Sequence, residues 1–409
     1  MRFSKAVDPV GVSPSLNRRS FLCTAAAGFR SIAQAQPANV PEAIRNLRPM
    51  TSGIQPITGD ERRARLEKAR RLMHENRMNA VLMEGGSSAF YFTGSRMDGG
   101  VLVLPLRSEI IRLTPPTSVT DDDEKYRTIA KALRDSGAAA GRVGIEERVH
   151  FDVVNGVSKL APAVEFVSAD RVTAGCRMIK SPAEIALMQR ANDITIAAYK
   201  AALASLREGM TQRELSAMIG AAYQALGVKG GAMAIFGKYT AFPHGSVQPQ
   251  QLREGDLVLI DDGCSVEGYQ SDITRTVIFG KPTARQREIW ALERKAQDAA
   301  LTAAKPGDTC ESVDAAARKV ITDAGLGPGY KVPGLPHRTG HGIGLDGHEW
   351  TYLVRGNKTR LKPGMCFSDE PTIAIYGEFG VRLEDCMYIT EDGARMFTKQ
   401  SPAIDQPFG

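Results

Sequence analysis

The sequence of 409 residues has few aromatic residues, few cysteines and no long apolar run. A membrane-spanning helix needs roughly 20 consecutive apolar residues, so we expect no membrane span. Six cysteines are too few for a disulfide scaffold in a chain of this length. Cys264, Cys366 and Cys386 lie inside apolar runs and are therefore predicted to be buried free thiols.

The sequence also lacks a strong excess of one charge outside its first residues. The formal net charge is +6, but residues 1–35 contain five basic side chains and one acidic side chain. This leader accounts for +4 of the total and leaves +2 for the rest of the chain. Because that remainder is close to neutral, it predicts no nucleic-acid-binding surface. The length favours two domains.

Residues 1–35 are typical of a signal peptide for export. Asn17–Leu22 matches a twin-arginine motif, Cys23–Phe29 is mildly apolar, and Ala33–Ala35 forms a small-residue cleavage site. We therefore expect export by the twin-arginine route and a periplasmic location. A cytoplasmic protein with a disordered basic tail is the alternative.

The next part of the sequence predicts a linker and a small domain. Residues 36–60 are rich in Pro, Asn and Thr, which is typical of a linker. In residues 61–176, segments with helical periodicity alternate with short apolar runs, which predicts a small α/β domain. The expected helices and strands are Arg62–Asn79, Ala80–Met83, Val101–Leu106, Asp122–Ser136, Val143–Ile145 and Val164–Val167.

Residues 177–409 are predicted to form a second domain. Its helices are expected to begin at three capping boxes and one shorter copy of that design, namely Ser181–Glu184, Thr211–Glu214, Thr283–Gln286 and Gly307–Thr309. The segments Gly209–Gly227 and Gly307–Gly325 match in length and in the placement of Gly, Thr and apolar residues. This repeat predicts an α+β domain with two related halves, each combining two helices with a sheet.

A predicted hairpin brings two carboxylates together. The apolar run Leu257–Ile260 ends at Asp261, and a second strand contains Asp272. The two aspartates lie at equal distances from a turn expected at Val266-Glu267. We therefore expect them to face each other across neighbouring strands.

A second hairpin repeats this arrangement. Glu370 and Glu384 lie at equal distances from Gly377, which is expected at the turn. Like charges that face each other beside apolar strands are costly, because buried carboxylates must be protonated, paired or bound to metal. Two such pairs predict a divalent metal site.

A glycine-rich segment, Thr339–Glu349, supplies a histidine to this site. Glycines on both sides of His341 let the backbone approach a ligand closely. The segment is not a phosphate loop, because no strand–turn–helix pattern surrounds it, and His348-Glu349 lacks the second histidine of a zincin. Four carboxylates and one histidine are mostly oxygen donors, which suit Mn²⁺ better than a structural zinc.

These segments resemble the pita-bread metallopeptidases, in particular the Xaa-Pro aminopeptidase and prolidase branch with its creatinase-type N-terminal domain. The resemblance covers about residues 60–400 and implies a pita-bread catalytic domain over 177–409, preceded by a creatinase-like domain. The segments that carry it are Pro243–Gly245, Ile260–Gly263, Ser271–Thr276, Gly340–Gly344, Asp369–Pro371, Val381–Asp385 and, at the expected domain junction, Arg177–Pro182.

The resemblance implies metal-dependent hydrolysis of Xaa-Pro peptide bonds by a water that two metal ions activate. The ions are expected to be Mn²⁺, with Co²⁺ or Zn²⁺ as alternatives. The implied ligands are Asp261, Asp272, His341, Glu370 and Glu384. Substrates would be dipeptides or short peptides that contain proline, and the protein would be a homodimer.

The resemblance also implies roles for individual side chains around the metals. Glu370 would relay a proton as general base and then acid. His348 would stabilise the oxyanion, and His244 would hold the proline side of the substrate. Arg382 matches an arginine that is associated with the substrate carboxylate, or it pairs with Asp385 or Glu384. His337 is expected to support a ligand rather than to be one.

Two other functions remain open at this point. The first is a metal-dependent hydrolase on the same scaffold that acts on a non-peptide amide or another C–N bond. The second is a catalytically silent scaffold that binds partners, although the intact set of five ligands argues against it. The sequence does not distinguish a dipeptidase from an aminopeptidase, but Arg382 and the length favour short substrates.

Overall fold

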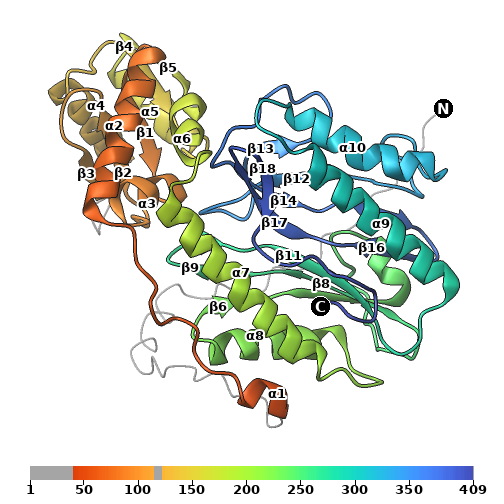
Figure 1. The fold of residues 1–409 in the computed structure, drawn as a ribbon. Coiled ribbons are helices and arrows are strands. Elements are labelled where there is room, and N and C mark those ends of the chain that lie inside the picture. The colour runs from red at the N-terminus through yellow and green to blue at the C-terminus, as the bar shows by residue number, and fades with distance from the viewer. Residues whose placement is uncertain (1–39, 115–121, 409) are drawn as a thin grey trace, which may run out of the picture. The chain divides into compact units, whose positions relative to one another are not determined.

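The computed structural model describes residues 40–114 and 122–408 (Figure 1). The signal peptide predicted for residues 1–35 therefore lies outside the described residues. Within the described part, no helix combines the length and the apolar character that a membrane crossing requires. The cysteines predicted to be buried free thiols, Cys264, Cys366 and Cys386, are buried and unpaired, which confirms that prediction.

The first part of the chain forms a five-stranded mixed sheet with the order β3-β2-β1-β4-β5. Strands β1, β4 and β5 are parallel, whereas β2 and β3 run antiparallel to their neighbours. Short helix α1 (Glu42–Arg45) precedes this sheet. The elements are α2 (Gly59–Glu75), β1 (Met78–Glu84), α3 (Ser87–Thr93), β2 (Val101–Pro105), β3 (Ile111–Leu113), α4 (Asp122–Asp135), β4 (Gly141–Ile145), α5 (Phe151–Leu160), β5 (Val164–Ser168) and α6 (Asp170–Arg177).

Strand β1 is almost continuously apolar because both of its faces are buried. Ala80 and Leu82 belong to one apolar cluster, whereas Val81 and Met83 belong to another. Successive side chains of a strand point to opposite faces, so β1 is covered on both sides and needs apolar residues at both. The predicted small α/β domain is confirmed, but helix α2 ends at Glu75 rather than at Asn79 because β1 begins at Met78.

The second part of the chain begins with a helix pair and a first group of short strands. These elements are α7 (Pro182–Leu203), α8 (Gln212–Ala225), β6 (Lys229–Gly230), β7 (Met233–Phe236), the 3₁₀ helix η1 (Gly237–Ala241), β8 (Leu257–Asp262), β9 (Cys264–Val266), β10 (Tyr269–Gln270) and β11 (Ile273–Ile278). Their strands form two small antiparallel sheets with the orders β11-β8-β7 and β10-β9-β6.

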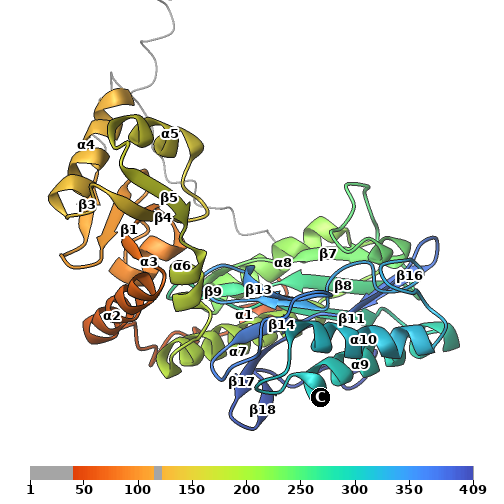
Figure 2. The ribbon, with the colours of Figure 1, turned by 90° about the horizontal axis from the view of Figure 1, so that it is seen from above.

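A second helix pair and a second group of strands follow. These elements are α9 (Ala284–Ala303), α10 (Cys310–Asp323), β12 (Gly340–Gly342), β13 (Glu349–Leu353), β14 (Cys366–Asp369), β15 (Thr372–Ile375), β16 (Phe379–Arg382), β17 (Asp385–Thr390) and β18 (Gly393–Met396). Five strands form a sheet with the order β13-β12-β14-β17-β18, and β15 pairs with β16. In the view of Figure 1, the helix pair α7–α8 lies below and to the left of strands β8 and β11, and the pair α9–α10 lies above them, while Figure 2 shows the same elements from above.

The repeat predicted from the sequence recurs in three dimensions. Helices α8 and α10 have the same length of 14 residues. Before them, Thr211 forms an isolated bridge with Gln251, and Thr309 forms one with Arg360. The three predicted capping boxes are present, whereas the side chain of Thr309 makes no capping hydrogen bond.

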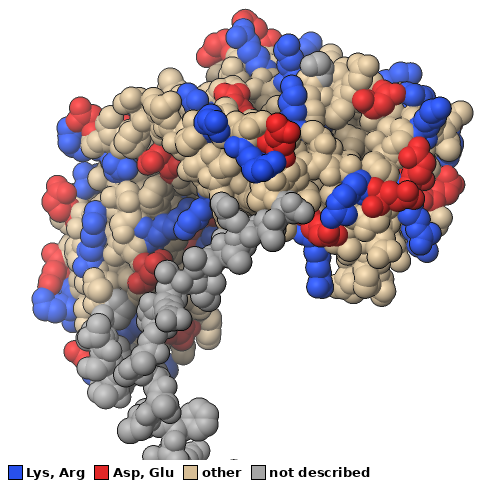
Figure 3. All heavy atoms as spheres, turned by 90° about the horizontal axis from the view of Figure 1, so that it is seen from below, with Lys and Arg blue, Asp and Glu red and all other residues tan. Residues whose placement is uncertain are grey.

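Charged side chains of both signs are mixed on the face of the molecule that Figure 3 draws. Figure 3 shows one face of the molecule, on which Lys and Arg alternate with Asp and Glu rather than gathering into a basic stripe. This distribution agrees with the small net charge that the sequence assigns to the chain beyond its leader.

Candidate metal centre

Strands β8 and β11 supply two carboxylates in a register that differs from the prediction. The turn lies at Glu267-Gly268, because Val266 pairs with Tyr269, and Asp261 therefore pairs with Thr274. The predicted direct opposition of Asp261 and Asp272 is wrong by two residues. Residues two apart on a strand point to the same face, so Asp272 lies on the same face as Thr274. Asp272 is therefore still a diagonal neighbour of Asp261.

The second pair of carboxylates follows the predicted register. Thr372 pairs with Arg382 in the β15–β16 hairpin, and Asp369 pairs with Asp385 in the β14–β17 ladder. Glu370 and Glu384 lie between these two ladders, directly after β14 and directly before β17. Their symmetry about Gly377 is thus confirmed.

A backbone contact joins the two halves at the centre. The N–H of Thr274 donates to the carbonyl of Glu384, and the N–H of Glu384 donates to the carbonyl of Thr274. This exchange brings the aspartates of the first half beside Glu384 of the second. The N–H of Glu370 donates to the carbonyl of Thr339, two residues before His341.

The five predicted ligands form two triads that share one member. Each triad places one ligand atom per residue within 4.8 Å of the others, and the two triads are Asp261–Asp272–Glu384 and His341–Glu370–Glu384. Because the two triads share the carboxylate of Glu384, the arrangement suits two neighbouring cations.

The ring of His341 offers a lone pair to this cluster. Nδ1 of His341 lies 3.1 Å from the carbonyl oxygen of Gly342, so Nδ1 carries the proton and donates it. Burial, followed by the neighbouring ring of His348, lowers the pKa of His341 to about 3, so the ring is neutral near pH 7. Nε2 is then an acceptor that faces two further acceptors, 3.3 Å from Oε1 of Glu370 and 3.7 Å from Oδ2 of Asp272.

The carboxylates show the same excess of acceptors over donors. Oγ1 of Thr274 lies 2.5 Å from Oδ1 of Asp261 and 2.7 Å from Oε2 of Glu384, although one hydroxyl proton serves only one of them. Oε1 of Glu384 is buried without a hydrogen-bond partner among the described residues. Burial, and then the charges of its neighbours, raise the pKa of Asp272 and of Glu384 well above the usual range. The five residues therefore fit divalent cations, which supply the missing positive charge.

Arg382 is committed to protein partners on all sides of its guanidinium. Nη2 contacts the carboxylate of Asp261, Nε donates to Oγ1 of Thr274 over 3.0 Å, and Nη1 donates to the carbonyl of Pro243 over 3.1 Å. The side chain is buried, with 3% relative exposure. Its predicted contact with a substrate carboxylate stays a prediction, and its observed partner is a different carboxylate from the two proposed neighbours.

The two predicted substrate-facing histidines, His244 and His348, are both exposed, which disfavours a buried structural role for them. The ring of His348 stacks on the ring of His341 with centroids 3.8 Å apart. Nδ1 of His348 lies 2.9 Å from Nη2 of Arg338, which donates to it. Because Nδ1 accepts, the neutral ring carries its proton on Nε2.

All eight predicted site residues line one cavity of about 470 Å³. Its lining residues are His244, Asp261, Asp272, Tyr330, His337, Arg338, His341, His348, Tyr352, Val354, Glu370, Arg382 and Glu384. His337 does not contact the cluster through its ring nitrogens, which instead meet the carbonyl of Arg338 and the hydroxyl of Thr372. Arg338 and Tyr352 also line the cavity and were not predicted from the sequence, although Arg338 directly precedes the glycine-rich segment.

Comparison with known proteins identifies the family. The model for metallopeptidase family M24 matches residues 186–391, and the model for the creatinase/prolidase N-terminal domain matches residues 65–179. The chain belongs to metallopeptidase family M24. The predicted family, enzyme class and use of divalent metal are therefore confirmed, whereas the individual roles of the site residues stay predictions.

Three relatives of this M24 chain match over almost their whole length. An Xaa-Pro dipeptidase of Pyrococcus furiosus is 33% identical over 348 residues, which cover 82% of this chain and 97% of that protein. The crystal structure of the prolidase from Pyrococcus horikoshii is 31% identical, with a TM-score of 0.72, and covers 82% of this chain and 98% of its own. The crystal structure of dipeptidase PepE from Mycobacterium ulcerans has a TM-score of 0.78 at 30% identity. The match covers 86% of this chain and 99% of that chain. These matches confirm the predicted pita-bread fold with its creatinase-like N-terminal domain.

Proposed function

We propose that this M24 metallopeptidase hydrolyses the peptide bond before proline in Xaa-Pro dipeptides. The observation that carries the proposal is one cavity in which the two ligand triads meet two exposed histidines. The names of the matched relatives, Xaa-Pro dipeptidase and prolidase, support the substrate class.

The metal ions are proposed to bind Asp261, Asp272, His341, Glu370 and Glu384. When bound, they supply a Lewis acid for the scissile carbonyl and lower the pKa of the attacking water. The set is dominated by carboxylate oxygens, which favours Mn²⁺ among the divalent ions.

One of these ligands and two neighbouring histidines complete the chemistry. Glu370 accepts a proton from the attacking water and returns it to the leaving nitrogen. His348 presents Nε2–H to the cavity because Arg338 occupies Nδ1, and this N–H stabilises the oxyanion that forms during attack. His244 holds the proline side of the substrate.

A dipeptide also presents a free carboxylate, and Arg338 is the guanidinium best placed to meet it. Arg338 lines the cavity and lies over the ring of Tyr352, with Cζ 4.6 Å from the ring centroid. Arg382 is less suited to this role because Asp261, Thr274 and Pro243 already occupy its nitrogens. A cationic wall of this kind favours dipeptides over longer peptides, whose next residue would lie where the carboxylate binds.

The experiment compares hydrolysis of Ala-Pro, Ala-Pro-Ala and Ala-Ala-Ala by metal-stripped protein, with and without added Mn²⁺. The dipeptidase proposal predicts Mn²⁺-dependent cleavage of Ala-Pro alone, lost in Asp272→Ala. Cleavage of both proline peptides would indicate an aminopeptidase. Absence of cleavage by protein shown to hold two metal ions would overturn the proposal and favour a non-peptide amide.

A further inference from the structure

The loop that carries His348 is folded around one buried carboxylate. Oε1 of Glu349 accepts hydrogen bonds from the backbone N–H of Leu345 over 2.8 Å and of Asp346 over 3.2 Å. Glu349 is the residue after His348 and the first residue of β13, so its side chain closes the loop on itself. A Cβ on Gly344 would lie 2.8 Å from Oε2 of Glu349, which is why the approach requires glycine there.

Two cations balance this carboxylate. Nη2 of Arg177 lies 2.5 Å from Oε1 of Glu349, and Nζ of Lys180 lies 3.1 Å from Oε2. Burial alone would raise the pKa of Glu349, but Lys180 and Arg177 outweigh burial and lower it to about 2. Glu349 is therefore a permanent anion whose position depends on these two partners.

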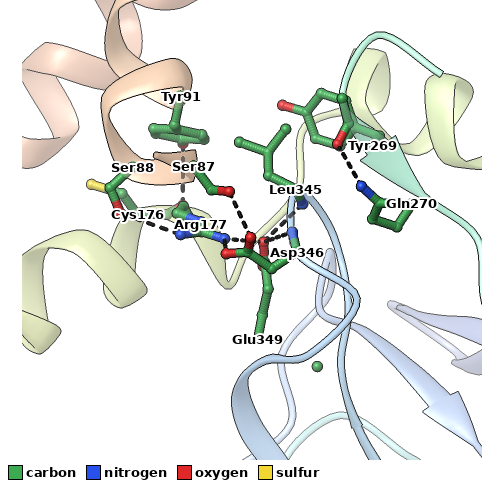
Figure 4. Close-up of polar contacts among 12 residues, drawn as sticks. Ser87, Ser88, Tyr91, Cys176, Arg177, Tyr269, Gln270, Leu345, Asp346 and Glu349 are labelled. Carbon is green, nitrogen blue, oxygen red and sulfur yellow. Dashed lines mark hydrogen bonds and ion pairs between the residues drawn. The ribbon is translucent and has the colours of Figure 1, made fainter. Parts of the chain in front are cut away.

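Arg177 holds a second point of the same loop. Its Nη2 lies 2.6 Å from Oδ2 of Asp346, and its Nη1 donates to Oγ of Ser88 over 3.2 Å. Figure 4 shows the guanidinium pointing toward both Asp346 and Glu349. The second carboxylate oxygen of Asp346, Oδ1, accepts a hydrogen bond from the hydroxyl of Ser87 over 2.6 Å.

The side chains that hold the loop come from the earlier part of the chain. Ser87 begins helix α3, Arg177 ends helix α6, and Arg148, which lies 3.3 Å from Asp346, follows strand β4. Ser87, Arg148 and Arg177 fall within the match to the creatinase/prolidase N-terminal domain. His348, at the other end of the loop, lies in the catalytic domain and faces the cavity.

We propose that Arg177 is a positioning residue for His348, through which the N-terminal domain sets the geometry of the catalytic cavity. Arg177 holds Asp346 and Glu349 in place, and these two residues hold the loop. The loop in turn positions the imidazole of His348, which lies between them in the sequence. Removal of one partner from a buried ion cluster leaves an uncompensated charge, so the loop would relax away from this arrangement. The inference rests on the proposed function for its catalytic consequence only.

The decisive test is a double-mutant cycle between Arg177→Ala and His348→Ala with Ala-Pro as substrate. In the wild-type background, Arg177→Ala should lower kcat/KM by about 100-fold, because a displacement of about 1 Å in a catalytic group has this effect. In the His348→Ala background, the same change should cost less than about threefold, because the residue through which it acts is gone. Equal losses in both backgrounds would overturn the inference.

Hydrogen exchange gives a readout that needs no activity. The amides of Leu345 and Asp346 donate to Glu349, so Arg177→Ala should accelerate their exchange at least tenfold, in metal-free and metal-loaded protein alike. Unchanged exchange at these amides would contradict the anchoring. A wild-type protein that cleaves no Xaa-Pro substrate would overturn the proposed function, while the exchange experiment would still decide the anchoring.

Two further variants separate positioning from loss of stability. Arg65→Ala removes another buried guanidinium, whose partners Glu61, Tyr91 and Tyr269 lie outside the loop. It should lower the melting temperature but leave exchange at Leu345 and Asp346 unchanged. If Arg177→Ala fails to fold, Ser87→Ala, which removes one hydroxyl from Asp346, should show the same coupling to His348→Ala with a smaller amplitude. Additivity of Ser87→Ala with His348→Ala would overturn the inference.

Discussion

Nε2 of His341 lies 3.3 Å from Oε1 of Glu370, although both atoms are acceptors when the ring is neutral and the carboxylate is charged. Burial, with the ring of His348 as the next cause, lowers the pKa of His341 to about 3. Two acceptors at this distance repel unless a proton or a cation lies between them. Either a proton on Glu370 or a cation must therefore lie at this contact, and a bound metal ion would meet that need when Glu370 is charged.

Metal binding should stabilise the wild-type protein strongly and the His341→Ala variant weakly. A ligand at about 100 times its Kd stabilises the native state by ~2.7 kcal/mol. His341→Ala removes one donor from a triad, so most of this stabilisation should be lost. Thermal unfolding with and without Mn²⁺ measures the difference, and metal content by mass spectrometry should fall in parallel. The same metal-induced shift in the variant would exclude His341 as a ligand.

The stability of the metal-stripped protein should fall as the pH rises. Burial raises the pKa of Glu370 to about 7 in the folded chain, above its ordinary value of 4.5. The folded state thus binds more protons than the unfolded state between these values, and stability is fully present below pH 4.5 and lost as the pH rises through 7. A shift of this size corresponds to on the order of 3 kcal/mol.

Chemical denaturation of the metal-stripped protein at pH 5, 6, 7 and 8 checks this expectation. Glu370→Gln supplies the matched control, because it cannot titrate and should show a flatter profile over the same range. A stability that rises between pH 5 and 7 in the metal-stripped wild type would contradict the assignment of a raised pKa to this carboxyl group.

The hairpins show how far local pattern determines register. The symmetry about Gly377 was sufficient for Glu370 and Glu384, because the β14–β17 and β15–β16 ladders share one register. At the other hairpin the turn was expected one residue too early. Glu267 and Gly268 both have positive φ, at 49° and 86°, which is the geometry of a two-residue hairpin turn that favours glycine in second place. That glycine was the signal for the correct register.

The cavity residues that were not predicted, Arg338 and Tyr352, belong to no periodic pattern in the sequence. Arg338 and Tyr352 meet in the cavity only because β12 pairs with β13. Tyr352 belongs to that ladder, and Arg338 lies two residues before it. The coupling of Arg177 to Glu349 likewise joins residues 172 positions apart. Caps, strand runs and turns are local and can be read from the sequence, whereas such contacts depend on how the elements pack together.

Arg338→Met should weaken the recognition of dipeptides that end in a free carboxylate. A hydrogen bond to a charged group contributes about 1.5–3 kcal/mol, so KM for Ala-Pro should rise between about tenfold and 100-fold. KM for Ala-Pro-amide should change little, because this substrate has no carboxylate to lose. Steady-state kinetics with both substrates measures the ratio.

Arg355→Met is the matched control for that experiment. Arg355 is exposed and lies 5.8 Å from the ring centroid of Tyr330, a residue that lines the cavity, but Arg355 itself does not line it. Its replacement should leave the selectivity between Ala-Pro and Ala-Pro-amide unchanged. Equal losses on acid and amide in Arg338→Met would show that Arg338 acts through His348 rather than on the substrate carboxylate.

Thr274→Val should weaken metal binding without disrupting the fold. Thr274 is buried, and its hydroxyl contacts a carboxylate from each half of the domain, Asp261 and Glu384. Partners that orient metal ligands typically contribute 10-fold to 100-fold in metal affinity, so a loss of about that size is expected from competition with a metal indicator. Thr276→Val, two residues along the same buried strand, removes a hydroxyl that bonds only the backbone of Arg382. This control should lower stability by a similar amount and leave metal affinity unchanged, so equal metal affinities in the two variants would contradict a role for Thr274 in orienting the carboxylates.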